Sequence, residues 1–142
     1  MTTIREILQT KGREIWSVAP TSTVFEALEL LADKQIGAAL VVDSGRPVGI
    51  FTERDYARKV ILKDRTARET AVEEVMTANP VCIRPEQTVD EAMALMTAKR
   101  FRHLPVIESD RLVGLVSIGD VVKAKISEQT FAIQQLENYI SS

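Results

Sequence analysis

The chain has 142 residues, a length that fits one ordinary domain or two small units sharing one core. A formal net charge of −2 offers no basic stripe for a phosphate backbone, so nucleic acid is not expected as a partner. No apolar run approaches the roughly 20 residues needed to span a bilayer, and the charged N-terminus does not fit a signal peptide, so neither a membrane nor export is expected.

The single cysteine, Cys82, excludes an internal disulfide and fits a reducing cytoplasm. Because it lies in an expected strand, we predict that it packs in the core. One histidine and one cysteine leave no room for a Cys–His zinc site, so no metal is expected.

An internal repeat organises the chain, because residues from about Ile15 to Val60 recur without a gap 65 positions later. This constant offset indicates a duplication. The matched pairs include Pro20 and Pro85, Thr23 and Thr88, Glu26 and Glu91, Gly49 and Gly114, and Asp55 and Asp120.

The first copy reads as strand, helix, strand, strand, helix, and a further helix precedes it. Two S/T-x-x-E capping boxes, at Thr3–Glu6 and Thr23–Glu26, mark helix starts. The expected elements in chain order are a helix over 3–9, an extended segment over 16–20, a helix capped by Thr23, strands over 38–43 and 48–52 joined by a hairpin turn, and a helix near Thr52.

The second copy follows a charged linker over 63–74 that is expected to turn into a helix ending in "EVMT". Beyond this copy, Ile126, Ile133, Leu136 and Ile140 form an apolar stripe of the kind that packs on the body or on a second subunit. The expected elements are an extended segment over 81–85, a helix capped by Thr88, strands over 104–109 and 112–117, and a helix near Ser117.

The predicted class is therefore α+β, with two β-α-β-β-α repeats. The predicted division is 1–64 for the first repeat with its N-terminal helix, 65–125 for the linker and second repeat, and 126–142 for a C-terminal helix. Neither small unit can bury both faces of its sheet alone, so we expect the two to pack together.

Two matching polar motifs close the repeats, Thr52-Glu-Arg-Asp55 and Ser117-Ile-Gly-Asp120. Each has the spacing of a helix cap, which is one interpretation. The other is a ligand site, because an Asp one turn into a helix can accept hydrogen bonds from the two hydroxyls of a ribose, while the hydroxyl and free amides can hold a phosphate. The two interpretations are compatible.

The order, spacing and duplication of these segments closely resemble the cystathionine-β-synthase (CBS) domain. The resemblance is carried by "GAALVVDSGRPVGIFTERD" and by "PVCIRPEQTVDEAMALMTAKRFRHLPVIESDRLVGLVSIGD", each after its preceding helix. It implies two repeats packed about a pseudo-twofold axis, a homodimer, and clefts that bind AMP, ADP, ATP, S-adenosylmethionine or NAD.

The resemblance also implies two ligand sites, each combining residues of both repeats. The segment "KRFRHLP" contributes to one of these sites in this interpretation; the alternative is that it is only a solvated basic helix end, which the helix dipole favours. A lone Trp is often core or interface packing, and about three extra residues around "TKGR" set Lys11 apart from its counterpart. Site A comprises Thr52, Arg54, Asp55, Thr77, Val81, Phe101, Arg102 and His103, and site B comprises Lys11, Trp16, Ile36, Gly37, Ser117 and Asp120.

The leading hypothesis is a cytoplasmic, non-catalytic module that senses an adenine nucleotide or related ligand and signals to a regulated partner by a shift in conformation. A second hypothesis is a ligand-independent oligomerisation or partner-binding module that acts through the terminal helix. A third is a small nucleotide-modifying enzyme, but the sequence presents no nucleophile–base pair for it. Site A, with its cations, is expected to hold phosphate more strongly than site B.

Overall fold

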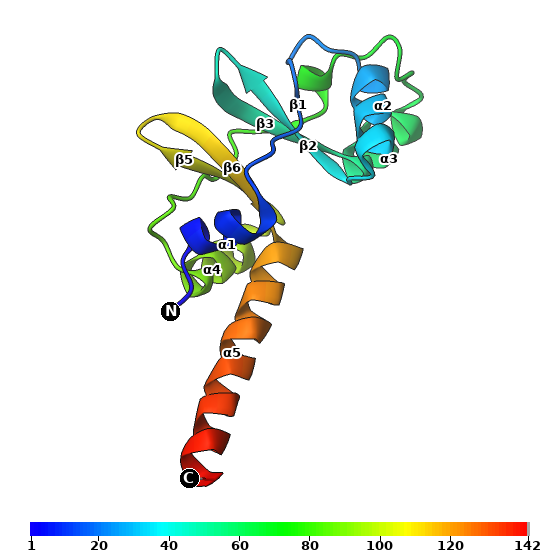
Figure 1. Ribbon diagram of the computed structural model, residues 1–142. Coiled ribbons are helices and arrows are strands. Elements are labelled where there is room, and N and C mark those ends of the chain that lie inside the picture. The colour runs from blue at the N-terminus through cyan, green and yellow to red at the C-terminus, as the bar shows by residue number, and fades with distance from the viewer. Residues whose placement is uncertain (142) are drawn as a thin grey trace. The chain divides into compact units, whose positions relative to one another are not determined.

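The computed structural model describes residues 1–141, which form helices and strands in the predicted alternation (Figure 1). The first part of the chain comprises α1 (Ile4–Lys11), β1 (Ser17–Val18), α2 (Val24–Lys34), β2 (Ala38–Asp43), β3 (Arg46–Thr52), α3 (Glu53–Lys59), and the 3-10 helices η1 (Ile61–Lys63) and η2 (Val72–Glu74). The second part comprises β4 (Thr77–Ala78), α4 (Val89–Lys99), β5 (His103–Glu108), β6 (Arg111–Ser117) and α5 (Ile118–Ser141).

The duplication seen in the sequence is also a duplication of local structure. The helices α2 and α4, and the hairpins β2–β3 and β5–β6, have bounds that differ by 65 positions, as 24 and 89 or 46 and 111 show. The capping boxes at Thr23 and at Thr88 form in full, whereas at α1 the Thr3 hydroxyl accepts from the Glu6 amide without the reciprocal bond of a full box. Both hairpins turn through two residues of positive φ, and Ser44-Gly45 and Ser109-Asp110 therefore form the left-handed turns that suit the strand twist.

The chain divides into two compact units, which do not follow the order of the sequence. The repeat-1 unit is residues 15–80, and the repeat-2 unit is residues 1–14 together with 81–141. The N-terminal helix α1 therefore packs with the second repeat, although the sequence order places it beside the first.

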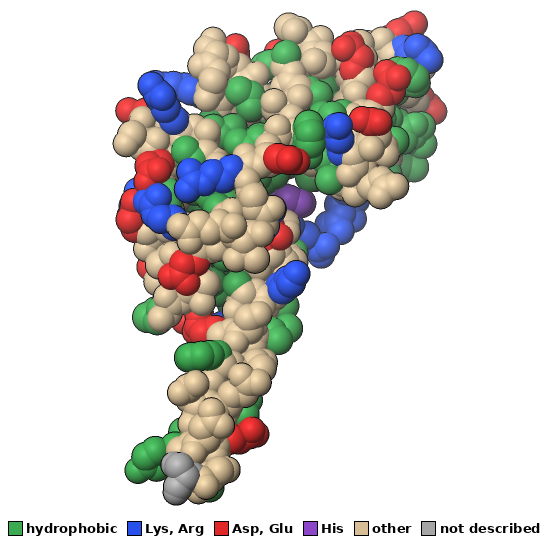
Figure 2. Space-filling model, in the orientation of Figure 1, with side chains coloured by type: hydrophobic (Ala, Val, Ile, Leu, Met, Phe, Trp, Pro, Cys, Tyr) green, Lys and Arg blue, Asp and Glu red, His purple; other side chains and the backbone are tan. Residues whose placement is uncertain are grey.

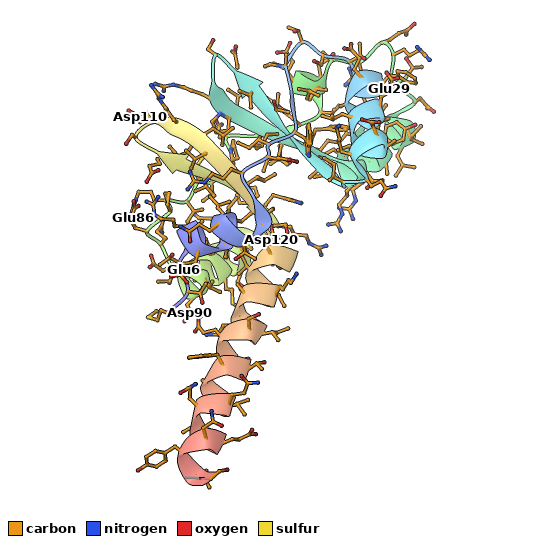
Figure 3. All side chains as sticks on the ribbon, in the orientation of Figure 1. Glu6, Glu29, Glu86, Asp90, Asp110 and Asp120 are labelled. Carbon is orange, nitrogen blue, oxygen red and sulfur yellow. The ribbon has the colours of Figure 1, made fainter. Side chains whose placement is uncertain are left out.

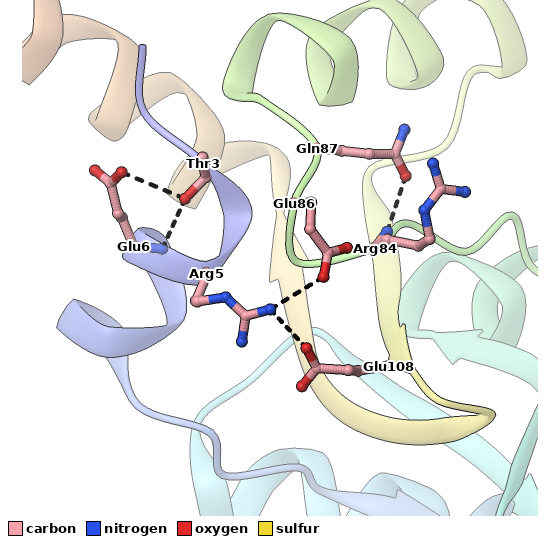
Figure 4. A network of polar contacts seen from close by, with 7 residues as sticks. All are labelled: Thr3, Arg5, Glu6, Arg84, Glu86, Gln87 and Glu108. Carbon is pink, nitrogen blue, oxygen red and sulfur yellow. Dashed lines mark hydrogen bonds and ion pairs between the residues drawn. The ribbon is translucent and has the colours of Figure 1, made fainter.

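Polar and steric contacts of α1 explain why it packs with the second repeat. The Arg5 guanidinium lies 3.1 Å from Glu86 and 2.6 Å from Glu108 of the second repeat (Figure 4). Leu8 lies against Gly114, where a Cβ atom would stand only 2.7 Å from a Leu8 methyl carbon. Gly114 is thus required for the close approach of α1 to β6.

The repeat-1 unit is a four-stranded sheet in the order β1-β2-β3-β4 with α2 and α3. Its buried core is built mainly from branched side chains around Phe51. The linker does not form the expected helix up to "EVMT": only the single 3-10 turn η2 forms, and β4 follows at Thr77. Met76 crosses over Gly49, the counterpart of the contact between Leu8 and Gly114.

The repeat-2 unit combines the hairpin β5–β6 with α1, α4 and the first turns of α5. The extended segment before α4 joins the hairpin through a parallel bridge from Ile83 to Val106. The prediction that Cys82 packs in the core is wrong, because Cys82 is exposed. Successive residues of an extended segment face opposite sides, and here Ile83 takes the buried side.

Candidate functional site

The polar motif of the repeat-2 unit lies where β6 ends and α5 begins. Figure 3 places Asp120 in the first turn of α5, at the opposite end of the hairpin from Asp110. The Ser117 hydroxyl accepts a hydrogen bond from the Asp120 amide at 3.1 Å, and the Ser117 amide donates to Asp120 Oδ2 at 2.8 Å. The motif therefore forms a reciprocal helix cap, as its spacing predicts.

Lys11, the last residue of α1, also reaches this carboxylate. Its ammonium group lies 2.5 Å from Asp120 Oδ2 and donates to the Leu115 carbonyl at 2.9 Å. Burial opposes ionisation of Asp120, but the bonds from Lys11 and Ser117 outweigh it and hold the pKa of Asp120 below its ordinary value. Two predicted residues of site B, far apart in sequence, thus meet in one unit.

The corresponding motif of the repeat-1 unit forms the same cap but leaves less of its carboxylate available. Asp55 Oδ2 accepts from the Thr52 amide and hydroxyl, at 3.0 and 3.1 Å, and Lys59 lies 3.2 Å from Oδ1. In Asp120 both bonds converge on Oδ2, and within residues 1–141 no hydrogen bond reaches Oδ1. The Asp120 side chain is 23% exposed and the Asp55 side chain 10%.

The backbone amides at the two helix starts are used in the same way. The first amides, of Ile118 and Glu53, donate to the carbonyls of Arg102 and Gly37 at 2.8 and 3.2 Å. The third amides donate to the capping hydroxyls. Among the described residues, the second amides, of Gly119 and Arg54, have no acceptor. One N–H per helix therefore remains for an anion.

Three cationic or titratable side chains surround the Asp120 end of the repeat-2 unit. His103 begins β5 and is paired in register with Ser117. Burial lowers the pKa of His103, repulsion from Lys11 and Arg102 lowers it further, and the Asp120 carboxylate partly offsets both. Arg102 and Lys11 are exposed, so this end presents positive charge to solvent.

The remaining predicted site residues are divided between the units. Val81 and Phe101 of site A are half-buried and pack against the core of the repeat-2 unit. Thr77 pairs with Ile50 in the sheet of the repeat-1 unit, and Arg54 is exposed on α3. Each predicted site thus draws members from both units, and each unit holds members of both sites.

A surface pocket of about 510 Å³ lies at the end of α2 in the repeat-1 unit, and Ile36 and Gly37 of site B line it with Leu28 and Glu53. Trp16 is 36% exposed, and the Lys34 ammonium lies 4.2 Å from its ring centroid. A pocket of about 290 Å³ in the repeat-2 unit is lined by Lys11 and Asp120, among others.

Sequence reasoning missed three participants. Lys59 pairs with Asp55 at i,i+4 spacing, a signal that the sequence contained. Glu53 contacts Gly37 at the pocket and the Lys34 ammonium lies over the Trp16 ring, and neither contact had a local signal. No group of three or more His, Cys, Asp or Glu among residues 1–141 could hold a metal ion. No helix in the same range is long and apolar enough to cross a membrane.

A duplicated α+β unit, with a capped Asp after the second strand of each hairpin, defines a class of tandem repeat proteins. The CBS domain model matches residues 3–62 and 72–127 of this chain. The chain belongs to the CBS domain family, which confirms the resemblance and the predicted α+β fold.

Known proteins agree with this assignment. The chain is 39% identical over 148 residues to the CBS domain-containing protein CBSX3, mitochondrial, of Arabidopsis thaliana, covering 98% of this chain and 72% of that protein. A solved protein with CBS domains from Burkholderia ambifaria MC40-6 is 51% identical with a TM-score of 0.85, over 90% of this chain and 96% of the other.

A more distant structure holds a ligand. The CBS domain protein PAE2072 from Pyrobaculum aerophilum, complexed with AMP, has a TM-score of 0.74 and 25% identity, over 83% of this chain and 88% of the other. Other relatives are much longer: the chain spans only 22% of CBSCBSPB5 of Arabidopsis thaliana, at 35% identity over 84% of this chain.

Proposed function

We propose that this protein is a regulatory module that binds an adenosine-containing nucleotide at the Ser117–Asp120 end of its repeat-2 unit. The observation that carries the proposal is the unshared Oδ1 of Asp120 next to the Gly119 amide and three basic side chains. PAE2072, a solved relative with the same fold, is complexed with AMP, which supports this ligand class.

The chemistry of a nucleotide matches the groups at this end. A ribose offers two neighbouring hydroxyls, and a carboxylate with one free oxygen can accept a charge-assisted bond from them. The Gly119 N–H and the Ser117 hydroxyl suit a phosphate oxygen, and Arg102 supplies positive charge. AMP, ADP, ATP, NAD and S-adenosylmethionine all contain the ribose, so they share the Asp120 contact and differ in the charge that they bring.

The repeat-1 unit is proposed as a second ligand-binding element. Its pocket at Ile36 and Gly37 has room and apolar wall for a base, and Arg54 provides an exposed cation and a free amide. Both oxygens of Asp55 are engaged, so a ribose there competes with Lys59. We therefore expect tighter ribose binding at Asp120 than at Asp55, whereas the stronger phosphate affinity predicted for site A stays a prediction.

The signal is proposed to start at Lys11. A ribose hydroxyl that bonds to Asp120 competes with the Lys11 ammonium, which joins α1 to the start of α5. Nucleotide binding then changes how firmly α1 is held, and a regulated partner reads that change as a population shift. Replacement of Lys11 by Met removes the competitor and should weaken this response while retaining the Asp120 acceptor.

A thermal-shift and calorimetric panel of AMP, ADP, ATP, NAD and S-adenosylmethionine tests the proposal. At least one ligand should raise the melting temperature and saturate with about one equivalent at the Asp120 end. The matched control is Glu91→Gln, which makes the same carboxylate-to-amide change in a helix cap of the same unit far from Asp120 in the sequence. No shift with any ligand at millimolar concentration would instead favour the ligand-independent module.

A further inference from the structure

The last helix of the repeat-2 unit is much longer than its counterpart in the first repeat. Both helices begin at equivalent positions, but α3 has 7 residues and α5 has 24. From Gln129 to Ser141 every residue is exposed, and α5 continues past α1 and α4 (Figure 1). The exposed segment, residues 129–141, is so short that a helix of its length is marginal in water by itself, so it needs a partner surface to be stable.

The exposed part of α5 carries a regular apolar seam along one face. Its members alternate in steps of four and three residues, which is the a/d spacing of a coiled coil. At 100° per residue they fall within a stripe about 80° wide. The seam consists of Val122, Ile126, Gln129, Ile133, Leu136 and Ile140, and its five apolar members are between 42% and 81% exposed.

The side of α5 that contacts its own unit lies about 60–120° around the helix axis from the centre of the seam. Val121 is buried in the core, Lys125 bonds to Asp90 of α4 at 2.9 Å, and Glu128 accepts from the Thr2 amide at 3.0 Å. The seam thus borders the contacting side but remains exposed, and the unit cannot cover it without releasing these contacts. Figure 2 shows hydrophobic side chains exposed along the length of this helix.

The seam is complementary to itself when a second copy runs antiparallel. Residues whose numbers add to 262 then face each other, which pairs Val122 with Ile140, Ile126 with Leu136, and Gln129 with Ile133. The twofold symmetry repeats these pairs and gives six layers. In this register Lys123 flanks the seam beside Glu137 of the second copy, so opposite charges meet at both ends.

A parallel pair lacks the match of charges. Each residue would face its own copy, and the two Gln129 amides could hydrogen-bond to each other, so the charged residues decide between the orientations. Lys123 and Glu137 would stay 14 residues, or about 21 Å, apart along the axis. We propose that α5 joins two copies of this chain through an antiparallel two-helix coiled coil. The proposal is independent of nucleotide binding.

Sedimentation velocity of the full chain tests the interface. The native protein should be a dimer in the tens of micromolar range, and Ile133→Glu should weaken the dimer at least tenfold. The matched control is Phe131→Glu: Phe131 is 63% exposed but lies on the opposite side of the helix from the seam, so the dimer should persist. Lys123→Glu should weaken the dimer, and adding Glu137→Lys should restore it.

Cysteine cross-linking in a Cys82→Ser background tests the orientation. Ala132→Cys lies next to its own copy at the twofold axis of the antiparallel pair and should form an inter-chain disulfide. Ile140→Cys should not, because its copies lie about 27 Å apart along the axis. A native monomer, a dimer unaffected by Ile133→Glu, or cross-linking through Ile140→Cys in place of Ala132→Cys would overturn the proposal.

Discussion

Replacement of Asp120 by Asn separates a helix cap from a ligand contact. In the unliganded protein Asp120 accepts the Ser117 amide and the Lys11 ammonium, and both partners of the ion pair are partly exposed. Asn can still accept the Ser117 amide, so weakening of the cap costs at most about 1 kcal/mol, and loss of the partly exposed ion pair adds between about 0 and 1 kcal/mol. The melting temperature should therefore fall by at most about 6 °C.

The effect on nucleotide affinity should be larger than the effect on stability. Asn keeps an acceptor but loses the charge, and a hydrogen bond to a charged group contributes about 1.5–3 kcal/mol. The dissociation constant for AMP should thus rise about ten- to hundredfold. The assays are urea unfolding without ligand and calorimetric titration with AMP, with Glu91→Gln as the cap-only control. Native-like AMP affinity in Asp120→Asn, together with a loss of stability, would refute the ligand role.

Two further predictions concern stability. Gly114→Val should destabilise the protein by about 1–3 kcal/mol in urea unfolding, because the new side chain overlaps Leu8. Gly119→Ala should not destabilise it, because the added Cβ would lie 3.6 Å from the Ser117 hydroxyl oxygen, an ordinary van der Waals contact. Native-like stability of Gly114→Val would mean that α1 can move off β6. The His103 pKa is lowered by burial and by its cationic neighbours, so below about pH 6.5 the unfolded chain binds a proton before the folded chain does. The free energy of unfolding should therefore fall as the pH drops from about 6.5 toward the folded pKa. His103→Gln should remove this part of the dependence of stability on pH between pH 5 and 7. An unchanged dependence would contradict the cause assigned to the lowered pKa of His103.

Much of the local structure could be predicted from the sequence because its signals are local. The Thr23 and Thr88 caps, the hairpins and the helix starts after Thr52 and Ser117 each depend on residues within a few positions of one another. Because the two copies are offset by 65 residues, each element predicted in the first copy also predicts its counterpart in the second. Bounds at 38–43 and 48–52 were accordingly close to those of β2 and β3.

The packing of α1 with the second repeat could not be predicted in this way. Thr3 and Glu6 mark where the helix begins, but the partner is selected by contacts of Arg5 and Leu8 with residues about 100 positions away. The same packing of α1 brings Lys11 to Asp120. Long-range packing of this kind has no periodic or spacing signal in a single sequence.

Burial was also harder to predict than secondary structure. In the extended segment before α4, Val81 and Ile83 share one side and Cys82 shares the other with Arg84. The alternation therefore favours Ile83 for the core, as the structure has it, and the prediction for Cys82 did not use it. The two capping Asp residues looked equivalent in sequence. Their difference comes from the positions of Lys59 and Lys11, of which only the first has a local spacing.

Calorimetric titration of the native protein with AMP, ADP, ATP, NAD and S-adenosylmethionine tests the central claim most directly. The account predicts saturable binding of at least one of these ligands with a defined stoichiometry, and competition among those that share the Asp120 contact. Absence of saturable binding for all five up to millimolar concentration would contradict the claim that the Ser117–Asp120 end is a nucleotide site.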